Sequence, residues 1–148
     1  MILVDITKDN WKKVIFLTTN TENRHTLSEE FVASNAYSIL ESFYEDQWNI
    51  KAIQHEGKLI GFTMYGLCEE RNFYELCRFM IDRKYQDKGY GTQALSLIVE
   101  EIKNKYSCNE IYLSTEPENV KAKHVYEKFG FVSTGEIWYD EELYVLKL

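Results

Sequence analysis

The sequence predicts a mixed α/β fold with the element order β-α-α-β-β-β-α-β-α-β-β, which differs from a regular βαβ repeat. Three observations predict it. Apolar residues recur with helical spacing in several segments of the chain. Between residues 51 and 81 the pattern changes to apolar runs separated by turn residues, and residues 131–148 repeat that extended pattern.

The first elements are a strand and two helical segments. Residues 3–6 are apolar and predict a short strand. Asn10 can cap a helix, and the apolar spacing that follows it predicts a helix to Leu17. The polar residues 18–28 predict a loop, and helical spacing returns over 29–44, which predicts one helix, broken or continuous.

The next segment predicts a meander of three antiparallel strands. The apolar runs 51–55 and 59–67 flank the turn Glu56-Gly57-Lys58 and predict a hairpin. A second turn at 69–72 leads into a third strand over 73–81.

Helices and strands alternate after residue 86. An apolar stripe predicts a helix of about four turns, and residues 111–114 predict a strand. Asn119 can cap a further helix, which Gly130 ends. The stripe consists of Leu95, Ile98, Val99, Ile102 and Tyr106.

The chain ends in a predicted hairpin, whose strands 131–138 and 143–148 flank Asp140-Glu141. No linker-like tract interrupts the pattern, and 148 residues lie within the usual size of one domain. We therefore expect residues 1–148 to form a single domain.

The composition favours a globular protein of the cytoplasm. Hydrophobic residues make up 45% of the chain and charged residues 28%, which excludes disorder. No apolar run approaches the ~20 residues that span a membrane, and the N-terminus does not resemble a signal peptide. Cys68, Cys77 and Cys108 lack the spacing of a disulfide framework or a zinc site, so no metal is expected.

The charge of the chain argues against general nucleic-acid binding, because the net charge is −7 and such binding needs a positive face. Residues 1–70 carry 6 Lys or Arg against 11 Asp or Glu, net −5. An acidic half suits a cationic partner, and the local cluster of Arg83, Lys84 and Lys88 suits a small anionic one. Ordinary solubility charge is the alternative explanation.

The segment around Gly89 and Gly91, between strand 73–81 and a helix, has the build of an anion site. N–H groups at a helix start are unpaired and carry partial positive charge, and glycines let a ligand approach them closely. Lys88 adds charge. Neither Gly-Lys-Ser/Thr nor G-x-G-x-x-G is present, so the common nucleotide motifs are excluded. The alternative is a tight connection that needs both glycines for its own geometry.

Two motifs resemble a known superfamily. Gln86-x-x-Gly89-x-Gly91 resembles the Q/R-x-x-G-x-G/A turn of the GNAT superfamily of N-acetyltransferases. The run from Asn119 to Phe131 is similar to its late N-x-x-A-x-x-x-Y-x-x-x-G-F segment, and the element order matches along essentially the whole chain. The resemblance implies the GNAT fold, a central mixed, mostly antiparallel sheet of about seven strands flanked by about four helices.

Three shorter segments, 31–35, 78–82 and 86–91, resemble bacterial spermine/spermidine N-acetyltransferases. One departure is Asp87, where such proteins usually have Gly. Its carboxylate must point away from the phosphates of a ligand or weaken their binding.

The resemblance implies acetyl-CoA as cosubstrate and no metal. The pantetheine arm would pair with the backbone of the strand 73–81 like an added strand, and the pyrophosphate would lie on the turn before the helix. The residues implied to bind acetyl-CoA are Phe79, Met80, Ile81, Gln86, Asp87, Lys88, Gly89, Tyr90, Gly91, Thr92, Asn119 and Tyr126. Asn119 can also serve only as a helix cap.

Two residues are expected to carry the chemistry. A primary amine with a pKa of ~10.4 is only about one part in 10³ neutral at pH 7, so a base must remove a proton. Glu75 has the parity of Cys77 and Phe79 along its strand and is the expected base, with a water chain as the alternative. The resemblance places Tyr126 near the sulfur of acetyl-CoA, where it would protonate or hydrogen-bond the leaving thiolate. A packing role is the alternative for Tyr126.

An acidic and aromatic group is expected to bind the substrate, since carboxylates and rings both attract a cationic chain. Its members are Glu41, Tyr44, Glu45, Trp48 and Glu75, with Asp46 beside them. A solvated helix end with packing aromatics is the alternative.

These expectations combine into an acetyl-CoA-dependent N-acetyltransferase, in which a primary amine, spermidine or spermine, attacks the thioester directly. The acceptor could instead be a protein N-terminus, an aminoglycoside or an amino acid. A non-catalytic acyl-CoA-binding regulator is the alternative of another class. The expected partner is a small-molecule amine, without nucleic acid or membrane, and a homodimer is left open.

Overall fold

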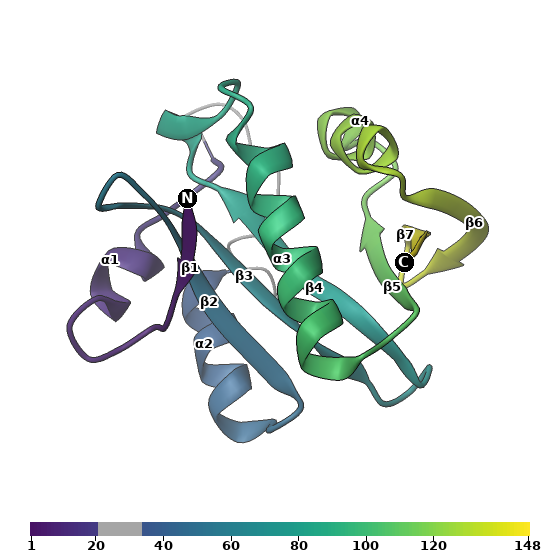
Figure 1. Cartoon of the computed structure of the whole chain (residues 1–148), viewed down its shortest axis with the longest axis horizontal. Coiled ribbons are helices and arrows are strands. Elements are labelled where there is room, and N and C mark those ends of the chain that lie inside the picture. Colours follow the sequence, from purple (N-terminus) through teal and green to yellow (C-terminus); the bar gives the residue numbers. More distant parts are fainter. Residues whose placement is uncertain (21–33) are drawn as a thin grey trace.

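The computed structural model describes residues 1–20 and 34–148 as a seven-stranded sheet with helices on both faces (Figure 1). The strands are β1 (Ile2–Val4), β2 (Trp48–His55), β3 (Lys58–Cys68), β4 (Phe73–Ile81), β5 (Glu110–Thr115), β6 (Val132–Trp138) and β7 (Glu141–Lys147). The helices are α1 (Trp11–Ile15), α2 (Asn35–Tyr44), α3 (Tyr90–Tyr106) and α4 (Val120–Phe129), with a short 3₁₀ turn at Arg83–Tyr85.

The strand order is β1-β2-β3-β4-β5-β7-β6. β4 and β5 run parallel, and the other neighbouring strands run antiparallel. The predicted mixed, mostly antiparallel sheet is therefore confirmed. Among the described residues, no helix has the length and apolar character needed to cross a membrane.

Two hydrophobic clusters fix the helices on opposite faces of the sheet. Leu95, Ile98 and Ile102 of α3 and Tyr126 of α4 are buried in the larger cluster. Val14 of α1 is buried in the smaller cluster on the other face, where α2 also packs. Figure 1 shows α3 crossing the centre of the sheet while α4 covers the β5–β7 side.

The two predicted Asn caps differ in the structure. The Asn119 side chain accepts a hydrogen bond from the Ala122 N–H at 3.2 Å, as expected of a helix cap. The Asn10 side chain instead accepts from the Thr7 N–H at 2.7 Å and makes no cap bond to α1. The prediction for Asn10 is wrong because its side chain turns back to the preceding loop.

The last hairpin also differs from the prediction. Tyr139 and Asp140 form the turn, with φ of 47° and 64°, so β7 begins at Glu141 rather than at residue 143. The predicted loop 18–28 lies mostly outside the described residues, as do residues 29–33 of the predicted helix 29–44.

A bulge interrupts β4. Met64 of β3 lies opposite Arg78, whereas the next residue, Tyr65, lies opposite Leu76. Cys77 is therefore an extra residue on β4, which breaks the alternation of its side chains between the two faces of the sheet.

The bulge changes which side chains share a face. Leu76 and Phe79 both pack in the α3 cluster, whereas Cys77 and Met80 pack in the cluster on the opposite face. The prediction that Phe79 shares a face with Glu75 and Cys77 is therefore wrong, because one inserted residue reverses the parity of all that follow.

Candidate active site

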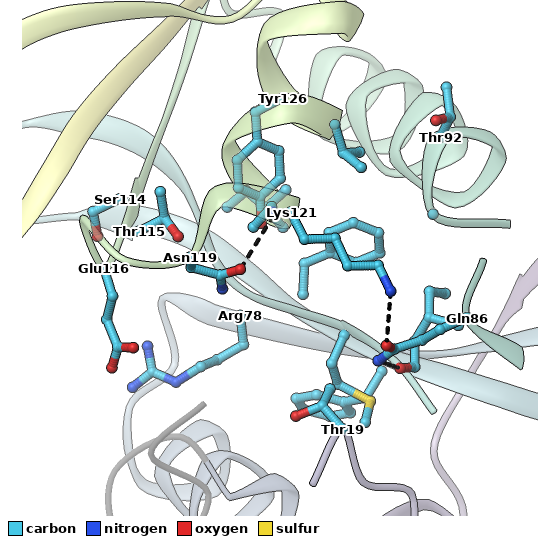
Figure 2. Close-up of a pocket in the computed structure, with 18 of the residues that line it drawn as sticks. Thr19, Arg78, Gln86, Thr92, Ser114, Thr115, Glu116, Asn119, Lys121 and Tyr126 are labelled. Carbon is cyan, nitrogen blue, oxygen red and sulfur yellow. Dashed lines mark hydrogen bonds between the residues drawn. The ribbon is translucent and has the colours of Figure 1, made fainter. Parts of the chain in front are cut away.

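A pocket opens where β4 and β5 diverge. The two strands pair only through Glu75 and Tyr112 among the described residues, and beyond that pair residues of both strands line the pocket. The first turn of α3 and the first turns of α4 complete the walls (Figure 2). The pocket therefore lies between two helix N-termini and a gap in the sheet.

Gly89 and Gly91 have different roles at the start of α3. Gly89 is the N-cap residue, and its φ of 78° lies in the left-handed region that favours glycine. Gly91 does not have a positive φ, and a Cβ built on it would meet no atom within 4 Å. The backbone conformation thus explains Gly89 alone, while Gly91 leaves an open approach to the N–H groups of the first turn.

Asp87 adopts a φ of 62°, which is the conformation that a glycine would take there with less strain. Its carboxylate forms an ion pair of 2.7 Å with Lys121 of α4. Lys121 also donates to the Gln86 side-chain oxygen at 3.3 Å, and Gln86 in turn donates to the Ile81 carbonyl at 2.9 Å. Figure 2 shows Lys121 extending from α4 to this turn. The positive charge of Lys121 therefore offsets the negative charge of the Asp87 carboxylate.

Tyr126 faces the pocket from α4 and is 8% exposed. Burial raises the pKa of its phenol, and the nearby charge of Glu141 acts in the same direction. The hydroxyl makes no hydrogen bond to the residues that the structure describes. Tyr126 is therefore a protonated hydrogen-bond donor that faces the pocket at neutral pH.

Glu75 is 8% exposed and lies beside the pocket without lining it. Burial, helped by the nearby charge of Glu141, raises the pKa of its carboxyl to about 7, although Arg78 and a hydrogen bond from the Cys68 thiol act in the opposite direction. A carboxyl with this pKa can exchange a proton near neutral pH, as a general base requires.

The end of the pocket away from α3 is polar. Arg78 and Glu116 lie there together in Figure 2, opposite Gln86 and Thr92. Ser114 and Glu141 also line the pocket, and the Ser114 hydroxyl donates a hydrogen bond to the Glu141 carboxylate. This end of the pocket thus carries two carboxylates.

Most of the residues predicted to bind a cofactor line this one pocket. They are Phe79, Met80, Ile81, Gln86, Asp87, Gly89, Gly91, Thr92, Asn119 and Tyr126. Lys88 and Tyr90 do not line it. The Lys88 ammonium donates to the Lys84 carbonyl at 3.2 Å, and the Tyr90 ring lies 4.7 Å from the His55 ring. Arg83 donates to the Asn20 carbonyl at 2.9 Å, away from the pocket lining.

The residues predicted to bind substrate do not line the pocket. Tyr44 is 75% exposed, and the Glu45 carboxylate accepts the Trp48 indole N–H at 3.0 Å. Glu41 is half-buried, and burial raises the pKa of its carboxyl, while the nearby Arg78 lowers it. Of the predicted group, Glu41 and Glu75 therefore lie close enough to Arg78 to influence this end of the pocket, whereas Tyr44, Glu45 and Trp48 form their own contacts at the end of α2.

Sequence reasoning missed several lining residues, namely Thr19, Arg78, Ser114, Glu116, Lys121 and Glu141. Lys121 could have been found, because it lies two residues after the cap Asn119 at the start of α4. Glu141 carried no local signal, because it was assigned to a turn. Among the described residues, no group of three or more His, Cys, Asp or Glu is placed to hold a metal ion.

Comparisons with known proteins find relatives both by sequence and by structure. The model of the Acetyltransferase (GNAT) family matches residues 12–131. A spermine/spermidine N(1)-acetyltransferase of Bacillus subtilis (strain 168) is 33% identical over 140 residues, covering 85% of this chain and 92% of the relative.

Two solved structures share the fold. An aminoglycoside acetyltransferase AAC(6′)-Ib in complex with coenzyme A has a TM-score of 0.77 at 17% identity, covering 99% of this chain and 94% of the other. A GNAT family acetyltransferase from Elizabethkingia anophelis with acetyl-CoA bound has a TM-score of 0.63 at 18% identity, covering 87% and 95%.

Proposed function

Because the chain belongs to the acetyltransferase (GNAT) family, we propose that it transfers the acetyl group of acetyl-CoA to a primary amine of a small molecule. One observation carries the proposal. A single pocket joins the open N-terminus of α3, which suits a pyrophosphate, to Tyr126 at the gap between β4 and β5.

The wall of the pocket suits each part of acetyl-CoA. The first-turn N–H groups of α3 would bind the pyrophosphate, and the open space at Gly91 lets it approach. Beyond Glu75 the edge of β4 towards β5 has no paired strand among the described residues, and its backbone from Phe79 to Ile81 would pair with the pantetheine arm. Lys121 can shift from Asp87 to a phosphate, since an exposed ion pair is weak.

The proposed reaction begins with a proton transfer. The bound ammonium loses one proton to Glu75, which is reached through a water molecule because Glu75 does not line the pocket. The neutral nitrogen forms a bond to the thioester carbonyl carbon, and the C–S bond breaks. The surplus proton on the new amide nitrogen then neutralises the thiolate, giving the acetamide and the CoA thiol.

Tyr126 assists the departure of sulfur by hydrogen bonding. The pKa of its phenol is raised above the ordinary value of ~10, whereas a free thiol has a pKa of ~8.5. Complete transfer of the phenolic proton to the thiolate is therefore uphill. A hydrogen bond from the hydroxyl to the developing negative charge requires no such transfer.

A polyamine is the acceptor that we favour. The relative at 33% identity is named for spermine and spermidine. The end of the pocket away from α3, which we call the acceptor end, carries Glu116 and Glu141, with Glu41 and Glu75 nearby. A primary ammonium with further positive charges along its chain complements these carboxylates. An aminoglycoside is the second candidate, because the AAC(6′)-Ib structure has the same fold and such a substrate is also a polycation.

An acceptor screen by thiol release tests this proposal. Spermidine and spermine are expected to give a kcat/KM at least about tenfold above that of a monoamine such as hexylamine. Each further hydrogen bond between an ammonium and a carboxylate strengthens binding by at least about tenfold. Their KM should rise with ionic strength, since salt screens the carboxylates. Equal rates with monoamines, peptide N-termini and amino acids would contradict the polyamine assignment.

The screen also separates an enzyme from a binding protein. Tight acetyl-CoA binding in a calorimeter without thiol release for any amine would indicate a non-catalytic acyl-CoA-binding regulator. A homodimer stays a prediction that light scattering can test.

The pH profile tests the role of Glu75. Its carboxyl must be ionised to accept a proton, so kcat/KM is expected to rise about tenfold per pH unit up to about 7 and then level off. Without a base, the rate follows the neutral amine and keeps rising towards pH ~10. Glu75→Gln is expected to convert the first profile into the second. A wild-type profile that still rises between pH 8 and 9 would show that Glu75 is not the base.

A further inference from the structure

Glu141 lines the pocket but takes no part in the proton transfer or the bond changes of the proposed reaction. It is the first residue of β7, and its side chain lines the pocket beside Ser114 of β5. The Ser114 hydroxyl donates a hydrogen bond to one carboxylate oxygen of Glu141. Ser114 therefore orients the Glu141 carboxylate from the neighbouring strand.

The adjacent Glu142 provides an internal comparison. Its carboxylate forms an ion pair of 2.7 Å with Lys123 of α4 and accepts a hydrogen bond from Tyr144 at 3.1 Å. Glu142 does not line the pocket, as expected for successive residues of a strand that face opposite sides of the sheet. The two glutamates thus differ in surroundings although they are neighbours in sequence.

Glu141 forms no ion pair with the residues that the structure describes. Its negative charge acts on both groups of the proposed chemistry, because it raises the pKa of the Tyr126 phenol and of the Glu75 carboxyl. Glu141 therefore lies within electrostatic reach of both the expected thiolate partner and the expected base.

We propose that Glu141, oriented by Ser114, binds the ammonium group of the acceptor that becomes acetylated. The inference rests on the proposed function and assigns the residue that holds the reacting nitrogen. An ammonium has three N–H donors, and a carboxylate that accepts one hydrogen bond from Ser114 retains acceptor sites for it. Charge-assisted bonds of this kind are short and directional, which places the nitrogen beside Tyr126 and the thioester.

Steady-state kinetics of Glu141→Gln, followed by thiol release with spermidine, tests the proposal. The amide keeps the shape of the side chain and can still accept from Ser114, so the fold should be unaffected. We expect kcat/KM for spermidine to fall about 10- to 100-fold, the range for loss of a charge-assisted hydrogen bond. The affinity for acetyl-CoA by calorimetry should stay within about twofold. Glu141→Asp, which keeps the charge, should recover part of the loss.

Glu142→Gln is the matched control and should retain wild-type kinetics with spermidine, because Glu142 faces α4. An unchanged kcat/KM in Glu141→Gln, with an active wild type, would overturn this inference and leave the proposed function intact. An equal loss in Glu141→Gln and Glu142→Gln would also overturn it, by pointing to general destabilisation of β7. If the wild type releases no thiol with any amine, the proposed function fails and the inference fails with it.

Discussion

Gly91→Val is expected to reduce the affinity for acetyl-CoA by about 100-fold or more. A branched side chain at this position would occupy the open space above the first turn of α3, so the pyrophosphate could no longer reach the N–H groups. Loss of two hydrogen bonds to a charged group is enough for an effect of this size. The fold should persist, because Gly91 has no positive φ and valine is no worse than glycine in a helix.

Gln93→Val is the control for this experiment. Gln93 is an exposed residue in the same turn of α3 and does not line the pocket, so the same side chain there should leave the affinity unchanged. Isothermal titration measures both variants, and circular dichroism checks their folding. A folded Gly91→Val protein with wild-type affinity would mean that acetyl-CoA does not bind at this helix start.

Tyr126→Phe is expected to lower kcat by at least about tenfold and up to about 10³-fold, with little change in the KM for acetyl-CoA. The change removes only the hydroxyl, which makes no internal hydrogen bond to the described residues, so packing and stability should be retained. Loss of a donor aimed at developing negative charge costs about 10²–10³ in well-characterised oxyanion sites.

Tyr144→Phe is the matched control, since Tyr144 is also buried but its hydroxyl donates to Glu127 and Glu142 and does not line the pocket. It should keep the wild-type kcat. Wild-type turnover of Tyr126→Phe across the pH range would show that Tyr126 serves packing alone.

The family and the order of the elements could be predicted from the sequence. The match to the Acetyltransferase (GNAT) family over residues 12–131 confirms the resemblance. The Gln86–Gly91 turn and the Asn119 cap are local features, since each depends on residues within one turn. Turns and helix caps of this kind can be predicted from neighbouring residues in the sequence, without knowledge of tertiary contacts.

The faces of β4 could not be predicted. The parity argument for Glu75 assumed an uninterrupted strand, but the extra residue at Cys77 is defined by the register with Met64 and Tyr65 of β3. No residue near Cys77 in the sequence predicts the bulge. Its position depends on pairing with another strand, which single-strand periodicity does not encode.

The residues at the end of the pocket away from α3 could also not be predicted from the sequence. Ser114 and Glu141 are 27 residues apart and meet only because β5 and β7 are paired in one register. The acidic and aromatic residues at the end of α2 suggested a cation site, yet Glu45 and Trp48 bond to each other. Charge density along the chain therefore did not point to Glu116 and Glu141, the carboxylates that line the pocket.

Among the described residues, β4 and β5 share only one backbone-paired position, so the seven-stranded sheet has two parts that are weakly paired to each other. β1 to β4 form one half and β5 to β7 the other, and they meet at Glu75 opposite Tyr112 and at the stacked rings of Phe73 and Tyr112. A cosubstrate bound in the pocket would contact both halves, because residues of β4 and of β5 line it. Its binding free energy then adds to the unfolding free energy of the whole chain, by about 2.7 kcal/mol at a concentration 100 times Kd. Resistance to heat and proteolysis should therefore follow the supply of acetyl-CoA.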